Sequence, residues 1–289
     1  MTPFTYRRPA HLNEAVSLLA TGTATTKLLA GGQSLLLALK ERALRPTCVL
    51  SLASLSELAG VRTASDGCLD IGATTTYATL ARSSFSGWHA EIAAVAGNLA
   101  DRSVRSLGTI GGGICQADPR FDMPTLLTAA GARMDLVAAS GRRCLAADEF
   151  FNANGGTHMT ASEILTRISI PAVQALDALA FEKFRFRAFE AAVVSVACAL
   201  KLGGDGRIAS ARLVVGAVAK APLKAIATAA ALVGRRPADL RIEEVGAQVA
   251  AEVAPLRAEQ PLRQRYQSEL TISLTAKALA RAAAQARGN

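Results

Sequence analysis

The stretch Leu28–Leu35, with the sequence LLAGGQSL, decides the fold of the N-terminal part of the chain. An apolar run, two glycines and a second apolar run are typical of a strand, a tight turn and a helix. The flanking pattern predicts helices over 12–20 and 34–43 and strands over 26–30 and 47–50, which form a βαβ unit. The turn is either a simple tight turn or a phosphate site, because glycines admit a close ligand and N–H groups opening a helix attract anions. Ser34 either caps the helix or donates its hydroxyl to a phosphate oxygen.

A second glycine-rich stretch, Gly108–Pro119 with the sequence GTIGGGICQADP, has similar chemistry. Three successive glycines can form a nest of N–H groups, which binds an anion without a charged side chain. Thr109 adds a hydroxyl, and Asp118 and Asp122 either cap the next helix or bind a ligand hydroxyl. Neither turn has the G-x-G-x-x-G spacing of a Rossmann site, and the near match at 204–209 is predicted to be a hairpin. Two phosphate-binding turns in one lobe suit a diphosphate, and so indicate a dinucleotide cofactor.

The rest of the chain divides into a mixed lobe and a small C-terminal sheet with helices. In the first lobe, the pattern predicts strands over 68–72, 134–138 and 164–170 and helices over 77–81, 90–99 and 124–130. Beyond 171–178 it predicts three antiparallel strands over 179–186, 193–202 and 211–218, and helices over 225–233, 238–251 and 268–287. We therefore expect an α+β protein with a first domain at 1–174, split into subdomains of about 1–58 and 59–174, and a C-terminal domain at 175–289.

Composition excludes several classes of protein. With 289 residues, 51% hydrophobic and 19% charged, the chain is expected to fold as a globule with a large core. Its net charge of +9 is spread over scattered arginines, which favours an acidic partner subunit or a phosphate-bearing ligand over nucleic acid. No signal peptide or run of 18 apolar residues is evident, so we expect a cytoplasmic protein without a membrane span. The five cysteines and three histidines lack metal-ligand spacing, so no metal is expected in this chain.

Several motifs closely resemble the medium, flavin-binding subunit of molybdenum hydroxylases, the family of xanthine dehydrogenase and carbon monoxide dehydrogenase. The two FAD motifs of that family match AGGQS at 30–34 and TIGGG at 109–113, read together with Asp118 and Asp122. Further pieces follow in the family's order: Phe4–Pro9, Arg42–Pro46, Leu69–Ala73, Arg105–Gly108, Glu163–Leu165 and Glu182–Phe184. One departure follows Lys183, where Phe189 and Ala191 exchange the bulk usual in the family while Glu190 keeps the acid.

The resemblance implies a two-subdomain FAD-binding domain of the vanillyl-alcohol-oxidase (PCMH) type, followed by a C-terminal sheet-and-helix domain. The cofactor-binding residues it implies are Leu28, Leu29, Ala30, Gly31, Gly32, Gln33, Ser34, Leu35, Leu99, Thr109, Ile110, Gly111, Gly112, Gly113, Asp118, Asp122, Leu165 and Lys183. The two motifs would hold the pyrophosphate and ribityl groups, and Asp122 would bind a cofactor hydroxyl. Leu99 and Leu165 would pack on cofactor rings. Lys183 would lie near the flavin, the alternative being a solvated strand residue.

The implied function is electron relay, with no catalytic residue and no metal in this chain. A large partner would carry the molybdenum cofactor and hydroxylate the substrate, an N-heterocycle, an aldehyde or CO. A small partner would carry two [2Fe-2S] clusters that pass electrons to the FAD, from which an external acceptor takes them. The complex would be a heterotrimer, doubled into a dimer. The alternative is a basic module that binds a nucleotide diphosphate and has no redox role.

Overall fold

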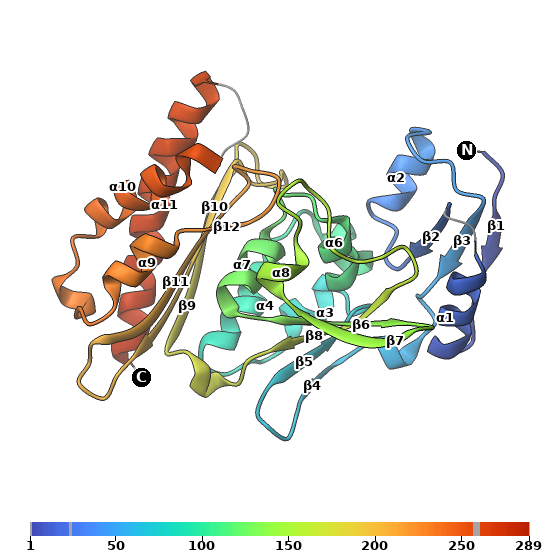
Figure 1. Ribbon diagram of the computed structural model, residues 1–289, viewed down its shortest axis with the longest axis horizontal. Coiled ribbons are helices and arrows are strands. Elements are labelled where there is room, and N and C mark those ends of the chain that lie inside the picture. Colours follow the sequence, from blue (N-terminus) through green and yellow to red (C-terminus); the bar gives the residue numbers. More distant parts are fainter. Residues whose placement is uncertain (1, 23–24, 257–260, 289) are drawn as a thin grey trace.

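The first subdomain of the computed structural model is a small parallel sheet with two helices (Figure 1). The structure describes residues 2–22, 25–256 and 261–288. Strands β1 (Thr5–Arg7), β3 (Cys48–Ser51) and β2 (Thr26–Leu29) lie in that order, with helices α1 (Leu12–Thr21) and α2 (Leu35–Lys40). The predicted βαβ unit is thus present, but α2 is shorter than the predicted 34–43. Arg42 has a φ of 59°, and this left-handed residue ends the helix.

The second subdomain is a five-stranded antiparallel sheet covered by short helices. The strands follow the order β4 (Val61–Thr63), β5 (Leu69–Gly72), β8 (Ile164–Ile170), β6 (Arg133–Ala138) and β7 (Gly141–Ala146). The helices are α3 (Tyr77–Arg82), α4 (Ala90–Gly97), α5 (Arg102–Leu107), α6 (Ile110–Gln116), α7 (Asp122–Ala130) and α8 (Ala147–Phe150). Short 3-10 helices lie at Ser56–Leu58, Gly87–His89 and Val173–Ala175, and further ones lie at Pro237–Asp239 and Ala254–Leu256 in the C-terminal part of the chain. Sequence patterns did not predict β1, β4, β7, α5, α6 or α8.

The C-terminal domain is an antiparallel sheet backed by three helices. Its strands follow the order β12 (Leu223–Lys224), β11 (Ile208–Gly216), β10 (Val194–Leu202) and β9 (Ala178–Phe184). Its helices are α9 (Ile226–Leu232), α10 (Ile242–Val253) and α11 (Pro261–Gly288). The prediction of three strands missed β12, whose two residues are too few for a pattern. The predicted hairpin joins β10 to β11, where the Gly203 N–H donates to the Arg207 carbonyl at 2.7 Å.

Both faces of the C-terminal sheet are buried. Alternate residues of β10 pack in opposite directions: Val196 and Cys198 join the core with α9–α11, whereas Ala197 and Ala199 join the core of the second subdomain. Figure 1 shows this sheet standing between α9–α11 and the helices α4 and α7. Arg212 of β11 strengthens the contact, because its guanidinium donates to the carbonyls of Ala129 and Ala130 at the end of α7.

Over the described residues, no helix combines the length and apolar character needed to cross a membrane. Within the same residues, no three His, Cys, Asp or Glu side chains are grouped so that they could hold a metal ion.

Candidate functional site

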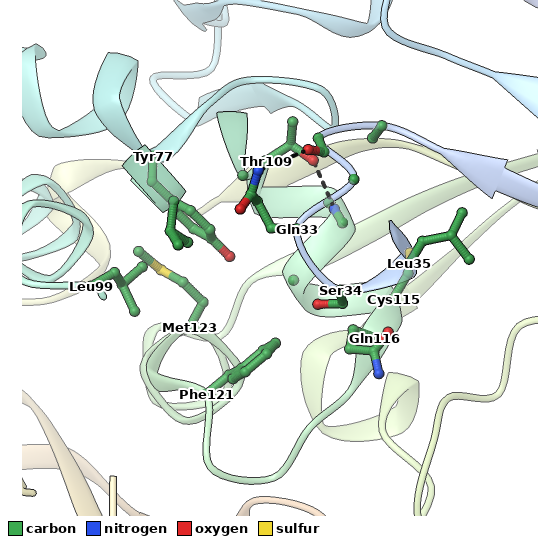
Figure 2. Close-up of a pocket in the computed structure, with 18 of the residues that line it drawn as sticks. Gln33, Ser34, Leu35, Tyr77, Leu99, Thr109, Cys115, Gln116, Phe121 and Met123 are labelled. Atoms are coloured by element: carbon green, nitrogen blue, oxygen red, sulfur yellow. Dashed lines mark hydrogen bonds between the residues drawn. The ribbon is translucent and has the colours of Figure 1, made fainter. Parts of the chain in front are cut away.

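A cavity lies where the first subdomain, the second subdomain and β9 meet. Its volume is about 550 Å³, within the range typical of small-molecule sites. The turn after β2, the α6 segment and the start of α7 line it, and Lys183 of β9 closes one side. Figure 2 shows labelled side chains from both glycine-rich segments facing the same open space. The folded chain thus brings the two segments that the sequence singled out to one site.

The first glycine segment offers unused donors to this cavity. The backbone N–H groups of Gly32, Gln33 and Ser34 donate to no acceptor among the described residues. Ser34 is the N-cap residue of α2, yet its side chain makes no capping hydrogen bond, so the capping alternative is wrong. A Cβ on Gly31 would lie 2.0 Å from the Leu107 carbonyl oxygen. Glycine is therefore required where this turn meets α5, and the turn presents a row of free donors to the cavity.

The second glycine segment is built differently from the predicted nest. Residues 110–116 form helix α6, with Thr109 as N-cap accepting from the Gly112 N–H at 3.1 Å. The N–H groups of Ile110, Gly111 and Gly113 donate to the carbonyls of Thr75, Ala73 and Thr109. The prediction of an anion-binding nest at Gly111–Gly113 is therefore wrong, because the donors that a nest would offer are used inside the protein. Because these glycines have no side chains, the backbone of α6 itself forms part of the cavity wall.

Asp122 and Lys183 form a buried ion pair on the cavity wall. Their side chains are 3% and 8% exposed, and the Lys183 ammonium donates to the Asp122 carboxylate and to the Asn98 carbonyl. Asp122 is the first residue of α7, with Phe121 as its N-cap, so it is not the cap itself. Burial raises the pKa of Asp122, while the charges of Lys183 and Arg185 oppose that rise. The solvated alternative for Lys183 is wrong, because the sheet and α7 enclose its side chain.

The structure brings most of the predicted binding residues to the cavity. Its lining includes Leu28, Leu29, Ala30, Gly31, Gly32, Gln33, Ser34, Leu35, Leu99, Thr109, Gly111, Gly112, Gly113, Asp122, Leu165 and Lys183. Ile110 and Asp118 do not line it. The Ile110 side chain is fully buried in the core of the second subdomain. Asp118 accepts from the Arg120 guanidinium at 2.6 Å, and Arg120 lines the cavity in its place.

Other lining residues carried no signal in the sequence. Tyr77, Met123 and Phe121 face the same space as the glycine segments (Figure 2). Cys115 also lines the cavity, with its Sγ 3.6 Å from the Met159 Sδ. Tyr77 and Met123 come from α3 and α7, and Phe121 is the N-cap of α7, so these three lie outside both glycine motifs. Cys115 lies inside the second glycine-rich stretch, on α6. Only the packing of three separate segments makes them neighbours.

The residues that follow β9 form part of the cavity rim. Phe189, Glu190 and Ala191 all line the cavity, and the Phe189 side chain is 68% exposed. Glu190 pairs with the exposed Arg187 at 3.3 Å. The exchange of a bulky and a small residue between positions 189 and 191 therefore falls at the cavity mouth.

Comparisons with known proteins define the class to which this fold and site belong. Residues 2–173 match the FAD binding domain in molybdopterin dehydrogenase, and residues 179–282 match the CO dehydrogenase flavoprotein C-terminal domain. The chain therefore belongs to the family of FAD-binding medium subunits of molybdenum hydroxylases, and it is an oxidoreductase subunit. The expected fold class and the expected FAD-binding domain are confirmed.

Particular relatives span nearly the whole chain. The glyceraldehyde dehydrogenase medium chain of Sulfolobus acidocaldarius is 34% identical over 253 residues, which cover 87% of this chain and 89% of the relative. The caffeine dehydrogenase subunit beta of a Pseudomonas species is 29% identical, covering 98% and 95%. Among solved structures, a chain of carbon monoxide dehydrogenase from Hydrogenophaga pseudoflava superposes with a TM-score of 0.89, at 31% identity and 99% coverage of both chains.

Proposed function

We propose that this chain relays electrons within a heterotrimeric molybdenum hydroxylase, from the clusters of a small subunit to an external acceptor. The observation that carries the proposal is the cavity itself. Gly32, Gln33 and Ser34, whose backbone N–H groups donate to no described acceptor, line a mostly apolar space of about 550 Å³. Residues 2–173 of the same chain match an FAD-binding domain. FAD combines a diphosphate, which needs donors, with two flat rings, which need apolar walls. The residues present fit both demands.

Each part of the cavity has a role in holding the cofactor. The N–H groups of Gly32, Gln33 and Ser34 would donate to the diphosphate, and the Ser34 hydroxyl would add a further donor. Leu99 and Leu165 would pack on the rings. The Asp122–Lys183 pair would lie at the flavin, with its charges already mutually compensated. When bound, FAD supplies a redox centre that accepts and releases electrons, and this chain orients it and excludes water.

The proposed partners are a large subunit with the molybdenum cofactor and a small subunit with two [2Fe-2S] clusters, doubled into a dimer of heterotrimers in the cytoplasm. The names of relatives support a partnered role, because several are called medium chains or subunits. The same names point to aldehydes, CO or N-heterocycles as the class of substrate. Co-expression with a large and a small subunit should give one species several times larger than 29.9 kDa on a sizing column. A medium chain that elutes alone would contradict the proposal.

FAD binding is the direct test of the cavity. The chain should bind FAD in about a one-to-one ratio, and acid precipitation should release the flavin to the supernatant. Flavin retained in the pellet would contradict noncovalent binding. A colourless protein that binds ADP but takes up no flavin would instead support a nucleotide-diphosphate module without a redox role.

The relay role is tested in the assembled complex. Alone, the chain should hydroxylate no heterocycle, aldehyde or CO, while dithionite should reduce its FAD. In a complex depleted of FAD, substrate should still bleach the iron–sulfur clusters in a single turnover, whereas steady-state transfer to the acceptor should collapse. Stopped-flow absorbance measures the single-turnover bleaching of the clusters separately from steady-state transfer to the acceptor. Steady-state turnover that survives without FAD would show that electrons leave elsewhere.

A further inference from the structure

Tyr77 places a hydroxyl without a partner in the wall of the cavity. The residue is 8% exposed and lines the cavity, yet its hydroxyl makes no hydrogen bond with any described residue. Figure 2 shows this oxygen pointing into the space bounded by Gln33, Ser34 and Met123. The hydroxyl is open to the cavity rather than sealed in the core, so a molecule that fills the cavity would bury it. A buried hydroxyl without a hydrogen-bond partner costs free energy. The orientation of Tyr77 therefore suggests that a bound molecule supplies the missing acceptor.

The backbone holds Tyr77 rigidly against the second glycine segment. Its N–H donates to the Gly108 carbonyl at 3.0 Å, and Thr76 pairs with Thr109 in an isolated bridge. Thr76 is also the N-cap of α3, accepting from the Thr79 N–H. These backbone contacts hold in place the Cα of Tyr77, from which the ring extends.

Gly113 leaves room for this hydroxyl. A Cβ on Gly113 would lie 2.1 Å from the Tyr77 Oη and 3.3 Å from its Cζ. The phenol oxygen therefore occupies the place of a side chain on α6. It lies between the second glycine segment and the space faced by Gln33 and Ser34.

The hydroxyl is a donor at neutral pH. Burial raises the pKa of Tyr77 well above its usual range, and the neighbouring Asp122 carboxylate raises it further. Asp122 itself accepts from Lys183 and makes no hydrogen bond with Tyr77. The phenol thus keeps its proton, and donates it in a hydrogen bond where an oxygen acceptor comes within reach.

From this geometry we infer that Tyr77 is a binding residue whose hydroxyl donates a hydrogen bond to an oxygen of the chain that links the flavin ring to adenosine. That oxygen belongs to a ribityl hydroxyl or to a phosphate. The inference rests on the proposed function, because it needs FAD in this cavity. It adds a side-chain donor to the unpaired backbone N–H groups of Gly32 and Gln33 in the same cavity.

The test compares FAD affinity of the flavin-free full chain with that of Tyr77→Phe, which removes only the oxygen. The dissociation constant, measured by quenching of flavin fluorescence, should rise about 10-fold or more, as expected for a lost hydrogen bond to a polar or charged group. Tyr6→Phe is the matched control, because Tyr6 is half-exposed on β1 and does not line the cavity. Its affinity should equal that of the wild type.

Thermal unfolding of the flavin-free proteins separates binding from structure. A hydroxyl that serves only the ligand predicts no loss of melting temperature in Tyr77→Phe. Lower stability with unchanged FAD affinity would overturn the inference. If the wild type itself binds no FAD, the proposed function fails. Tight binding by both proteins overturns the Tyr77 inference alone.

Cofactor fragments show which oxygen accepts. A loss of affinity for ADP in Tyr77→Phe supports a phosphate, and a loss for riboflavin supports a ribityl hydroxyl. Gly113→Ala gives an independent check, because its methyl group would displace the hydroxyl. Its loss of FAD affinity should not add to that of Tyr77→Phe in the double variant. Fully additive losses would overturn the placement of the hydroxyl at Gly113.

Discussion

The contribution of the Asp122–Lys183 ion pair to folding stability depends on the burial of both side chains. Two charges that are almost fully buried stabilise the fold only as a pair, and removal of one leaves the other uncompensated. We expect Lys183→Met to lower the free energy of unfolding of the flavin-free chain by about 3 kcal/mol. Adding Asp122→Leu should recover much of that loss. Urea unfolding gives both values.

The control for this pair is on the surface. Arg241 and Glu244 lie 2.9 Å apart with side chains 80% and 61% exposed. Arg241→Met should leave the midpoint of urea unfolding close to that of the wild type. A similar cost for Lys183→Met and Arg241→Met would mean that the buried pair is not enclosed as described.

Gly112 separates the effect of charge from the effect of size at the cavity wall. A Cβ on Gly112 would meet only the Thr109 Oγ1, at 2.8 Å, so a small side chain fits once that hydroxyl shifts slightly. Gly112→Asp should reduce FAD affinity more than about 100-fold, because its carboxylate repels the diphosphate at short range. Gly112→Ala is the matched control and should lose far less. Equal losses, measured by equilibrium titration, would assign the effect to size rather than charge.

At the scale of elements, one ion pair closes the long connection between α8 and β8. Glu163, just before β8, accepts from Arg143 of β7 and from the Thr160 N–H, while Arg143 also donates to the His158 carbonyl at 2.8 Å. The hydrogen bond from Arg143 is the main cause that holds the pKa of Glu163 below its usual value. The Glu163 carboxylate therefore favours the folded chain when it is ionised.

The sign of this linkage predicts an acid-dependent loss of stability. A lowered folded-state pKa adds stability that is fully present above the unfolded value, about 4.3, and is lost as pH falls through the folded value. Glu163→Gln should be less stable than the wild type by roughly 1 kcal/mol at pH 7, since Arg143 is partly exposed. The gap should shrink below about pH 4 in denaturant titrations. Glu190→Gln, at an exposed pair, is the control and should leave the stability at pH 7 close to that of the wild type.

Elements with a clear hydrophobic period could be predicted from the sequence, and the rest depended on tertiary contacts. The strand of 193–202 is largely an apolar run, and the strand of 164–170 has apolar residues at Ile164, Ile168 and Ile170 on one face, so both patterns favour a strand. Helix α6 was missed because three consecutive glycines disfavour a helix, and Thr109, Thr75 and Ala73 supply the contacts that hold it. Much of the site followed from the family motifs. Tyr77 had no signal of its own, since an aromatic residue opening a helix is ordinary.

At the scale of the molecule, the C-terminal sheet completes two cores at once. Leu179 and Phe181 of β9 pack with the second subdomain, while Ala178 and Ala180 pack with α9–α11. A fragment of residues 1–174 would expose the apolar faces of α4 and α7. We expect it to aggregate or to bind a hydrophobic dye strongly, and to hold no FAD after gel filtration. A monomeric fragment with native FAD affinity would show that the sheet is dispensable.

The position of β9 in the sequence also has a consequence for biosynthesis. Both glycine segments leave the ribosome before Lys183, which closes one side of the cavity, and before the sheet that buries its ion pair with Asp122. A nascent chain that has exposed only its first 170 residues thus presents an open half-site. Secure capture of the flavin is therefore a late event in the life of the nascent chain, and messages truncated ahead of β9 yield products without a firmly held cofactor.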